Sequence, residues 1–396
     1  MSNIMKSFLL LLVFFLCLSG CQKKEEEKEK ETEDIPVLKD YPVKHEEEFG
    51  GVYITISIDD FNKLGFVYGD SVDVAFSNGY TLEDIPYYNG YYVDAGEPLL
   101  IAYPGYEYIK AAINYGEDLW EKAGLLNAPV QSLFLKAGLD EKSTATITLN
   151  EAGKYRDVQE ARDIHYYDER ERYPSDEVFA NFRSMTGGDL REGAVYRSAS
   201  PCDNQHNRAP YVDELIKETG VNAILNLSDN ETKIQGYISS SSFSSPYFLS
   251  LYEAGNVFPI ALNMNYLSEE FAEKIAQGFK DISSKEGPYL IHCTEGKDRT
   301  GFVCIFIEAL AGASYEEIVD DYMKTYDNYY KINPESDPAK YHTIKEKNVD
   351  AMLKFVLGDA EADLETADLS EAVENYLLNA GMNMEEIGVF LNRITR

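Results

Sequence analysis

One stretch of the chain constrains its fold more than any other. A short apolar run at residues 288–292 leads without a spacer into a polar loop, and the loop leads into an apolar helix. The loop, residues 292–301, has the sequence His-Cys-Thr-Glu-Gly-Lys-Asp-Arg-Thr-Gly, and the helix is predicted over residues 302–311, ending at Gly312. A buried strand, a loop and a helix start are a unit of α/β sheets, whose ligands bind at the carboxyl ends of the strands. The sequence therefore predicts a ligand site in this loop.

The same alternation of strands and helices surrounds this stretch. Strands are predicted at residues 194–197, 221–227 and 257–262, and helices at residues 211–219 and 268–284. We therefore expect an α/β domain over residues 178–396, with a central, mostly parallel sheet that helices flank on both sides.

The loop places one cysteine and one arginine where the strand ends and the helix begins. Successive N–H groups and the positive end of the helix dipole converge there, and this suits a phosphate dianion or a thiolate. A cysteine attacks phosphorus only as the thiolate, so we expect Cys293 to be a nucleophile. Arg299 carries a planar guanidinium that can bind two phosphoryl oxygens.

The other loop residues are expected to support this chemistry. The phosphate would be surrounded by Thr294, Glu295, Gly296, Lys297, Asp298 and Arg299. Thr300 is placed to hydrogen-bond the sulfur of Cys293 and to stabilise it as a leaving group. His292 is expected to set the loop conformation through its ring nitrogens, because the strand points it away from its successor.

These residues resemble the Cys-based protein tyrosine phosphatase superfamily, and more narrowly its secreted bacterial branch with the His-Cys-x-x-Gly-Lys-Asp-Arg-Thr-Gly loop. Further motifs extend the resemblance from about residue 178 to the C-terminus: Asn-Phe-Arg at 181–183, Gly-Gly at 187–188, Val-Tyr-Arg-Ser at 195–198, Asp-Tyr at 321–322 and two final helices at 374–378 and 384–394. The resemblance implies a phosphomonoester hydrolase of the α/β phosphatase fold that acts through a phosphocysteine, without a metal or another cofactor. The implied substrates are phosphotyrosyl or dual-specificity protein substrates, or alternatively phosphoinositides or inositol phosphates.

The sequence departs from the superfamily pattern at the general acid. Many relatives carry an aspartate on a mobile loop before the cysteine, but residues 259–265 read Pro-Ile-Ala-Leu-Asn-Met-Asn and hold no carboxylate. Asp298 is the first candidate for the acid and Glu295 the second, while the alternative for Asp298 is that it only orients Arg299 or the loop. The strand ending at 226–228 reads Asn-Leu-Ser, where the branch has Asp-Leu-Arg.

The N-terminus has the pattern of a bacterial lipoprotein precursor. Lys6 precedes an apolar run at residues 8–18, and the small residues Ser19 and Gly20 precede Cys21. This ending resembles the lipobox, which implies a signal peptide at residues 1–20 and lipidation of Cys21. The alternative is an ordinary secretory signal or an anchor helix.

Two further regions separate this terminus from the phosphatase region. Residues 21–48 begin with a run of lysines and glutamates, which predicts a charged tether, so we expect a membrane-anchored, extracytoplasmic protein. Residues 49–152 contain short β-rich runs punctuated by glycines, which predict a small β-rich domain of unassigned function. Residues 153–177 are predicted to be a helical connector.

Composition excludes some classes of partner. The formal net charge is -33, from 36 Lys and Arg against 69 Asp and Glu, so we expect no binding of nucleic acid. The five histidines are scattered, and we expect no metal site.

Two other functions remain open: a surface binding protein of weak catalytic power, and a protein whose N-terminal domain defines the function.

Overall fold

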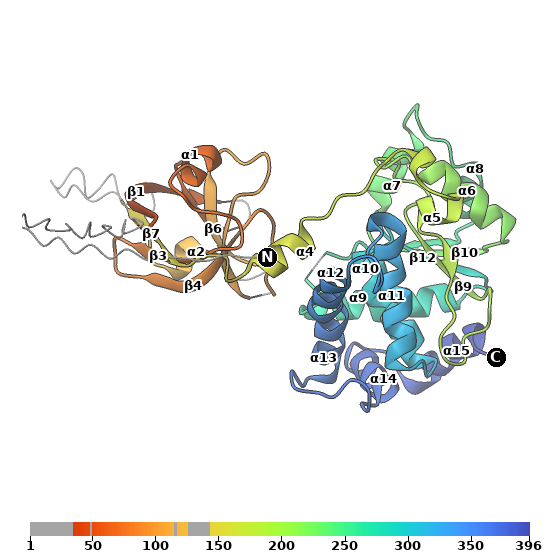
Figure 1. Cartoon of the computed structure of the whole chain (residues 1–396). Coiled ribbons are helices and arrows are strands. Elements are labelled where there is room, and N and C mark those ends of the chain that lie inside the picture. Colours follow the sequence, from red (N-terminus) through yellow and green to blue (C-terminus); the bar gives the residue numbers. More distant parts are fainter. Residues whose placement is uncertain (1–34, 48–49, 95, 115–116, 126–142, 264) are drawn as a thin grey trace, which may run out of the picture. The chain divides into compact units, whose positions relative to one another are not determined.

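The structure is a computed structural model that describes residues 35–47, 50–94, 96–114, 117–125, 143–263 and 265–396. The predicted signal peptide, Cys21 and the lysine- and glutamate-rich run lie outside these residues. Among the described residues, no helix has both the length and the apolar character needed to cross a membrane. Two sheets with separate hydrophobic cores form, and each is described by itself (Figure 1).

The first domain is a closed barrel of seven strands in the order β1-β2-β6-β5-β4-β3-β7. Its interior is apolar because alternate residues along each strand point inward, as Val72, Val74 and Phe76 do along β3. This confirms a β-rich domain ahead of the phosphatase region. The strands are β1 (Val37–Glu46), β2 (Gly51–Ile54), β3 (Ser71–Phe76), β4 (Thr81–Tyr88), β5 (Pro98–Ile101), β6 (Ile109–Ile113) and β7 (Thr144–Glu151), with short helices α1 (Ile58–Asn62) and α2 (Leu119–Lys122).

The barrel begins earlier than the sequence predicted. The predicted tether extends to residue 48, yet β1 is a barrel strand that pairs with β2 on one side and with β7 on the other. The prediction was wrong for this part because half of the residues of β1 are polar, which is typical of a solvated tether. Pairing with β2 and β7 makes β1 a strand, and the composition of residues 37–46 does not reveal this pairing.

The second domain has a sheet of five strands in the order β11-β10-β12-β9-β8. Strands β9 to β12 are parallel, and the short edge strand β8 pairs antiparallel with β9. The expected mostly parallel sheet is therefore present. The strands are β8 (Arg183–Ser184), β9 (Val195–Ser198), β10 (Ala223–Asn226), β11 (Val257–Pro259) and β12 (Tyr289–His292).

Helices cover both faces of this sheet. Along β12, Tyr289 and Ile291 belong to one core and Leu290 to the other, which is the alternation expected of a buried strand. The core of Leu290 includes α6 (Ala209–Glu218), α7 (Glu231–Ile238) and α8 (Pro246–Glu253). The opposite core includes α9 (Glu269–Ser283), α10 (Asp298–Leu310), α11 (Tyr315–Tyr330), α12 (Pro338–Ile344), α13 (Ala351–Leu357), α14 (Leu369–Asn379) and α15 (Met384–Ile394).

The predicted connector is only partly helical. Helix α4 (Arg156–Arg162) is followed by an extended segment, a short 3-10 turn at Arg170–Arg172 and then α5 (Asp176–Ala180). Residues 163–169 are extended because alternate side chains contact the second domain, and a helix would break that alternation.

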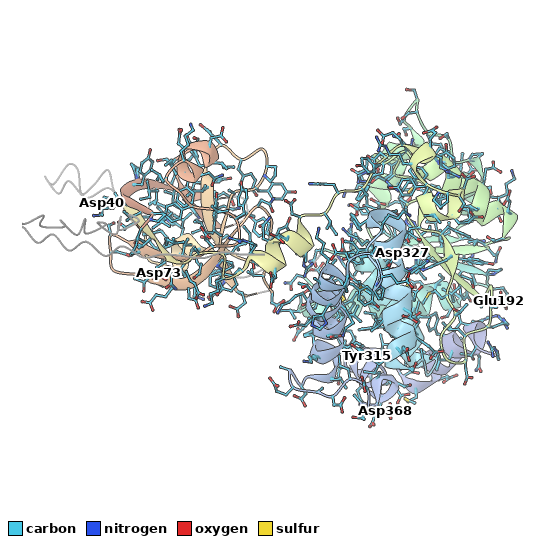
Figure 2. The ribbon with its side chains drawn as sticks, in the orientation of Figure 1. Asp40, Asp73, Glu192, Tyr315, Asp327 and Asp368 are labelled. Atoms are coloured by element: carbon cyan, nitrogen blue, oxygen red, sulfur yellow. The ribbon has the colours of Figure 1, made fainter. Side chains whose placement is uncertain are left out.

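Acidic side chains lie on the surface of both domains. Figure 2 marks Asp40 on the barrel, and Glu192 and Asp368 on the second domain, and all three are exposed. The negative surface gives an anionic substrate no general attraction, so binding must depend on a local site.

Candidate active site

The loop between β12 and α10 is fixed by its backbone carbonyl groups. The four carbonyls of residues 293–296 each accept a hydrogen bond from a group outside the loop's concave side. In chain order the donors are His292 Nδ1 at 3.2 Å, Ser200 N–H at 3.1 Å, the Tyr329 hydroxyl at 2.7 Å, and both Asn181 Nδ2 and Arg197 Nη2 at 3.1 Å.

This pattern determines where the N–H groups point. In a trans peptide the N–H of one residue is opposite to the carbonyl of the residue before it. The N–H groups of residues 294–297 therefore point away from the donors that hold the carbonyls, and none of them bonds an acceptor in the part of the chain that the structure describes. A row of such groups at a helix start binds anions.

The predicted nucleophile lies in this loop, and the predicted clamp lies in the helix turn that follows it. Cys293 is 3% exposed and directly follows β12. Arg299 lies in the first turn of α10, which begins at Asp298 and not at residue 302 as predicted, because the loop residues already adopt helical geometry. Its guanidinium donates to the carbonyl of Leu262 at 3.2 Å and to Thr294 Oγ1 at 3.4 Å, so it folds back toward the loop.

His292 and Thr300 were predicted to support the loop and the sulfur of Cys293, and the predicted contact is formed for His292 alone among the described residues. His292 is fully buried, and its Nδ1 bonds the carbonyl of Cys293. Burial lowers the pKa of His292 to about 4, so the ring is neutral near pH 7. The predicted bond from Thr300 to the sulfur of Cys293 is not formed: Thr300 Oγ1 is buried and has no hydrogen-bond partner among the described residues. Its role toward the sulfur stays a prediction.

Asp298 is the more accessible of the two candidate acids. Its side chain is 40% exposed and lies 3.8 Å from Lys297 Nζ, and the first turn of α10 places it beside Arg299. No hydrogen bond joins its carboxylate to the guanidinium in the described structure, which does not support the alternative that it orients Arg299 directly.

Glu295 and Lys297 form an ion pair at the rim of the loop. Lys297 Nζ lies 3.4 Å from Glu295 Oε2 and donates to the hydroxyl of Tyr330 at 3.2 Å. Burial raises the pKa of Glu295, but Lys297, Tyr166 and His206 outweigh it, and the pKa lies below its usual value. Glu295 is therefore ionised near pH 7, which makes it a poor source of a proton.

Residues distant from the loop in sequence bind its backbone and one another. Arg197 is 1% exposed, bonds the carbonyl of Gly296 and is ion-paired with Asp321, which also accepts from Arg183 Nε at 2.7 Å. Burial raises the pKa of Asp321, but the two arginines outweigh it and lower the pKa to about 2. The buried carboxylate thus stays charged and fixes both guanidinium groups.

Two glycines allow the loop and helix to approach their neighbours. Gly296 has a φ of +69°, and a Cβ there would lie 2.2 Å from the carbonyl oxygen of Ser198. A Cβ on Gly301 would lie 2.4 Å from the ring of Tyr322 on α11. The loop and α10 therefore pack more closely than any other residue type permits at these positions.

Several groups at the site were not predicted from the sequence. They are the hydroxyl of Tyr329, the N–H of Ser200, the carbonyl of Leu262 and the side chain of Tyr166. No local signal marks these residues, since a tyrosine on a helix or a main-chain group in a loop has no distinguishing pattern. The segment 259–265, which lacks a carboxylate, nevertheless serves the site through the Leu262 carbonyl.

The altered strand ending has a local role. Asn226 accepts hydrogen bonds at Oδ1 from the N–H groups of Ser228 and Asp229, both at 3.0 Å, and donates to Asp229 Oδ2 at 3.1 Å. These bonds close the turn that follows β10. The polar side chains of Asn226 and Asp229 are therefore hydrogen-bonded within this turn.

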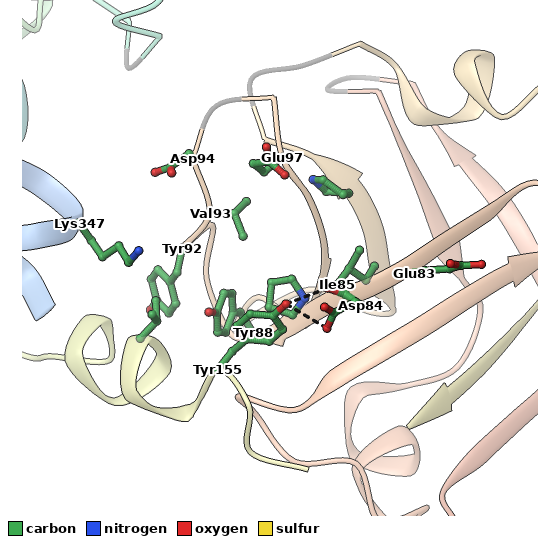
Figure 3. A pocket seen from close by; sticks show the side chains of 13 residues that line it. Glu83, Asp84, Ile85, Tyr88, Tyr92, Val93, Asp94, Glu97, Tyr155 and Lys347 are labelled. Carbon is green, nitrogen blue, oxygen red and sulfur yellow. Dashed lines mark hydrogen bonds between the residues drawn. The ribbon is translucent and has the colours of Figure 1, made fainter. Parts of the chain in front are cut away.

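One hollow is lined mainly by residues of the barrel. Its wall includes Tyr88, Tyr92 and Tyr155 together with Asp84 and Glu97, as Figure 3 shows. None of the predicted catalytic residues lines it. Among the described residues, no group of three or more His, Cys, Asp or Glu side chains is placed to hold a metal ion.

Comparison with known proteins gives one family and several solved structures. The model of the tyrosine phosphatase family matches residues 177–395, which is more than half of the chain. Among curated proteins, none matches the sequence. One similar structure is the core catalytic domain of the PP-IP phosphatase SIW14 from S. cerevisiae in complex with citrate. The two sequences are 18% identical, the match covers 46% of this chain and 92% of that chain, and the TM-score is 0.26. Another is TpbA from P. aeruginosa in complex with pTyr, with 12% identity, coverages of 41% and 87%, and a TM-score of 0.24.

Proposed function

Because the chain belongs to the tyrosine phosphatase family, we propose that it hydrolyses phosphomonoesters with Cys293 as the nucleophile and Arg299 as the phosphate clamp. One observation carries this proposal. Four successive carbonyls of residues 293–296 are bonded on one side of the loop, which leaves the N–H groups beside Cys293 to bind phosphoryl oxygens on the other.

The first step transfers the phosphoryl group to the enzyme. The thiolate of Cys293 forms a bond to phosphorus while the bond from phosphorus to the ester oxygen breaks. The N–H groups and Arg299 stabilise the charge that spreads over the equatorial oxygens. We assign to Asp298 the proton that the departing oxygen takes up, because its side chain is accessible at the mouth of the loop and Glu295 is held ionised.

The second step restores the enzyme. Water attacks the phosphorus of phosphocysteine and loses a proton to the carboxylate of Asp298, and the sulfur leaves as a thiolate. Inorganic phosphate is released. The same carboxyl group thus serves as acid and then as base, as microscopic reversibility allows.

The rim of the loop favours a monoester of a protein side chain as substrate, most directly phosphotyrosine. A ligand with several phosphates would need free cations, but Lys297 is 18% exposed and is paired with Glu295 and Asp298. Burial lowers the pKa of Lys297, yet Asp298, Tyr330 and Glu295 raise it well above its usual value, so its charge is present but balanced. Inositol phosphates and phosphoinositides are the second candidates.

The test replaces the nucleophile and the clamp separately. Cys293→Ser is expected to abolish hydrolysis of an aryl phosphate while it retains binding of inorganic phosphate, because the N–H groups and Arg299 remain. Arg299→Lys is expected to impair both, since a point charge cannot reproduce bidentate binding. Cys202→Ser, the same change at a buried cysteine outside the loop, serves as the control.

The outcome also separates an enzyme from a weak binding protein. An aryl phosphate has a good leaving group and needs little acid assistance, so even an enzyme with a weak acid turns it over, whereas a binding protein does not. Activity of Cys293→Ser within tenfold of the parent would remove Cys293 as the nucleophile.

We also propose that the protein is anchored outside the cytoplasm by lipid at Cys21. The support comes from the sequence of residues 1–34, which lie outside the described part of the structure. The barrel and the catalytic domain would then be held near a membrane surface.

A further inference from the structure

The upstream segment, residues 163–173, follows α4 and precedes residue 177, where the match to the tyrosine phosphatase family begins. Its side chains alternate along the extended stretch: Tyr166 and Asp168 are partly buried, whereas the residues on either side of them are exposed. One face of the segment therefore lies against the second domain.

Arg208, just before α6, is a buried arginine that this segment holds. Its side chain is 2% exposed, and Asp168 Oδ1 accepts a hydrogen bond from its Nη1 at 2.9 Å. The carbonyl of Tyr167 accepts from Nη2 at 3.1 Å, and the carbonyl of Phe179 accepts from Nε at 2.9 Å. A buried cation needs a partner, and Asp168 supplies it, so the guanidinium is fixed in one orientation.

The fixed guanidinium packs against the ring of Tyr329 on α11. The two groups lie 4.8 Å apart, and the guanidinium lies 4.7 Å from the ring of Tyr166. The ring of Tyr329 lies 5.3 Å from that of Tyr166 and is 4% exposed. Arg208 and an aromatic ring of the upstream segment thus hold Tyr329 in place.

The hydroxyl of Tyr329 connects this cluster to the backbone of the phosphate loop. It donates to the carbonyl of Glu295 at 2.7 Å and is the single donor to that carbonyl among the described residues, whereas the carbonyl of Gly296 has two. Burial raises the pKa of Tyr329, so the hydroxyl keeps its proton and remains a donor. The orientation of the Glu295 carbonyl therefore depends on Tyr329.

This carbonyl determines the direction of one N–H group at the phosphate site. In the peptide between Glu295 and Gly296, the N–H of Gly296 points opposite to the carbonyl of Glu295. Gly296 has a φ of +69°, and glycine restricts its own backbone less than any other residue does. The peptide therefore needs a restraint from outside the loop, and the hydroxyl of Tyr329 provides one.

We propose that Tyr329 is a positioning residue for phosphate binding, which fixes the N–H of Gly296 through the carbonyl of Glu295. Asp168 supports it from the upstream segment by holding Arg208 against its ring. The inference rests on the proposed function, because it concerns the same phosphate loop. Without the hydroxyl, the peptide between Glu295 and Gly296 loses its fixed direction, and its N–H is less well aimed at the phosphoryl oxygens.

The experiment uses the full chain and two matched pairs of variants. Tyr329→Phe keeps the ring and removes only the hydroxyl. Tyr167→Phe makes the same change where the side chain is 53% exposed and its hydroxyl has no hydrogen-bond partner among the described residues. Asp168→Ala removes the partner of Arg208, and Glu169→Ala removes the next carboxylate, which is exposed.

The readouts are the Kd and stoichiometry of inorganic phosphate by titration calorimetry, together with kcat/KM on an aryl phosphate. Tyr329→Phe is expected to raise the Kd and to lower kcat/KM, each about fivefold, the value of one neutral hydrogen bond. Tyr167→Phe is expected to match the parent. A purely structural effect would lower the folded fraction, and with it the stoichiometry, but would leave the Kd unchanged.

A double-mutant cycle tests whether Asp168 acts through Tyr329. Asp168→Ala is expected to raise the Kd for phosphate about two- to threefold, the lower end of the coupling between residues in contact, and Glu169→Ala is expected to leave it unchanged. In the Tyr329→Phe background, Asp168→Ala should have no further effect on the Kd, because the hydroxyl that it helps to orient is already absent.

Two results would overturn the inference. One is a Kd for phosphate in Tyr329→Phe that lies within twofold of the parent value. The other is the same loss from Asp168→Ala in the parent and in Tyr329→Phe. If the parent binds phosphate but hydrolyses no phosphomonoester, the proposed function fails instead, and the phosphate titrations still test the role of Tyr329.

Discussion

At the scale of single residues, burial and neighbouring charges together set the protonation of the side chains in and around the loop. His292 is buried and neutral, and its Nδ1 fixes the carbonyl of Cys293. Asp298 is the accessible carboxyl group, and Glu295 is held ionised by Lys297. In the proposed mechanism Asp298 is the acid, because its carboxyl group is accessible, whereas His292 and Glu295 support the loop.

Replacing Asp298 with Asn is expected to slow esters with poor leaving groups far more than activated aryl phosphates. General acid catalysis contributes typically about 10²- to 10⁴-fold, so the loss on phosphoserine should fall in that range. Parallel kcat/KM measurements on phosphoserine and an aryl phosphate test this. Glu295→Gln is the comparison, and it should affect both esters alike. An equal loss on both esters from Asp298→Asn would show that Asp298 only positions the loop.

The lowered pKa of His292 predicts a loss of stability in acid. An unfolded histidine binds a proton near pH 6.5, whereas the folded one does so only near pH 4. The unfolded state therefore gains protons first as the pH falls from 6.5 to 4, and the free energy of unfolding drops on the order of 3 kcal/mol from this residue.

Urea unfolding at pH 7 and pH 5, followed by far-ultraviolet circular dichroism, measures the part of this drop that falls between those two pH values, about 2 kcal/mol. Tryptophan fluorescence is unsuitable because the single tryptophan, Trp120, lies in the barrel. His292→Asn should reduce the difference between the two pH values, and His342→Asn, at a histidine that is 72% exposed, should not. An unchanged difference in His292→Asn would contradict the assignment.

At the scale of elements, the site depends on how closely β9, the loop and α10 approach one another. Arg197 on β9 and Asn181 after α5 both bond the carbonyl of Gly296. The carbonyl of Ser198 lies directly beneath the same glycine. The end of β9 and the middle of the loop are therefore in backbone contact.

Gly296→Ala is expected to destabilise the second domain by more than about 2 kcal/mol and to abolish phosphate binding. The new Cβ would meet the backbone of Ser198, and the alanine would be strained at the positive φ of this position. Gly220→Ala is the matched control, since Gly220 has the same φ of +69° and no atom within 4 Å of its Cβ position. That control should lose about 1 kcal/mol and retain phosphate binding. Equal losses in the two variants, measured by urea unfolding, would mean that the close approach to Ser198 has no consequence.

At the scale of the whole molecule, the chain combines a barrel with a domain of the tyrosine phosphatase family, and we propose that its N-terminal residues carry a lipid anchor. The barrel has its own hydrophobic core. The segment between α4 and α5 connects the two domains in sequence, and its Tyr166 and Asp168 contact His206 and Arg208 of the second domain.

Cys21→Ala in the native host is expected to prevent lipidation and to move the protein from the membrane fraction to soluble or unprocessed forms. A single acyl chain binds membranes only marginally, so stable anchoring depends on the several chains of a processed lipoprotein. Fractionation with immunoblotting measures the shift, and Cys202→Ser controls for loss of a cysteine elsewhere. Normal processing and membrane retention of Cys21→Ala would contradict the anchor.

The sequence by itself determined the parallel sheet and the loop between β12 and α10. Strand β12, the loop and α10 are contiguous, so the strand ending, the glycines and the Cys293 to Arg299 spacing are local signals that composition and periodicity carry directly. The resemblance to the phosphatase superfamily also implied the final helix, whose observed bounds are Met384–Ile394.

Only the tertiary structure decided which groups hold the loop. Ser200 and Tyr329 donate hydrogen bonds to the carbonyls of residues 294 and 295 from segments distant in sequence, and nothing in their local sequence marks them. The structure likewise made β1 a barrel strand and Glu295 an ionised rim residue. Each of these outcomes depends on partners brought close by folding, because hydrogen bonds and burial act between neighbours in space and not between neighbours in sequence.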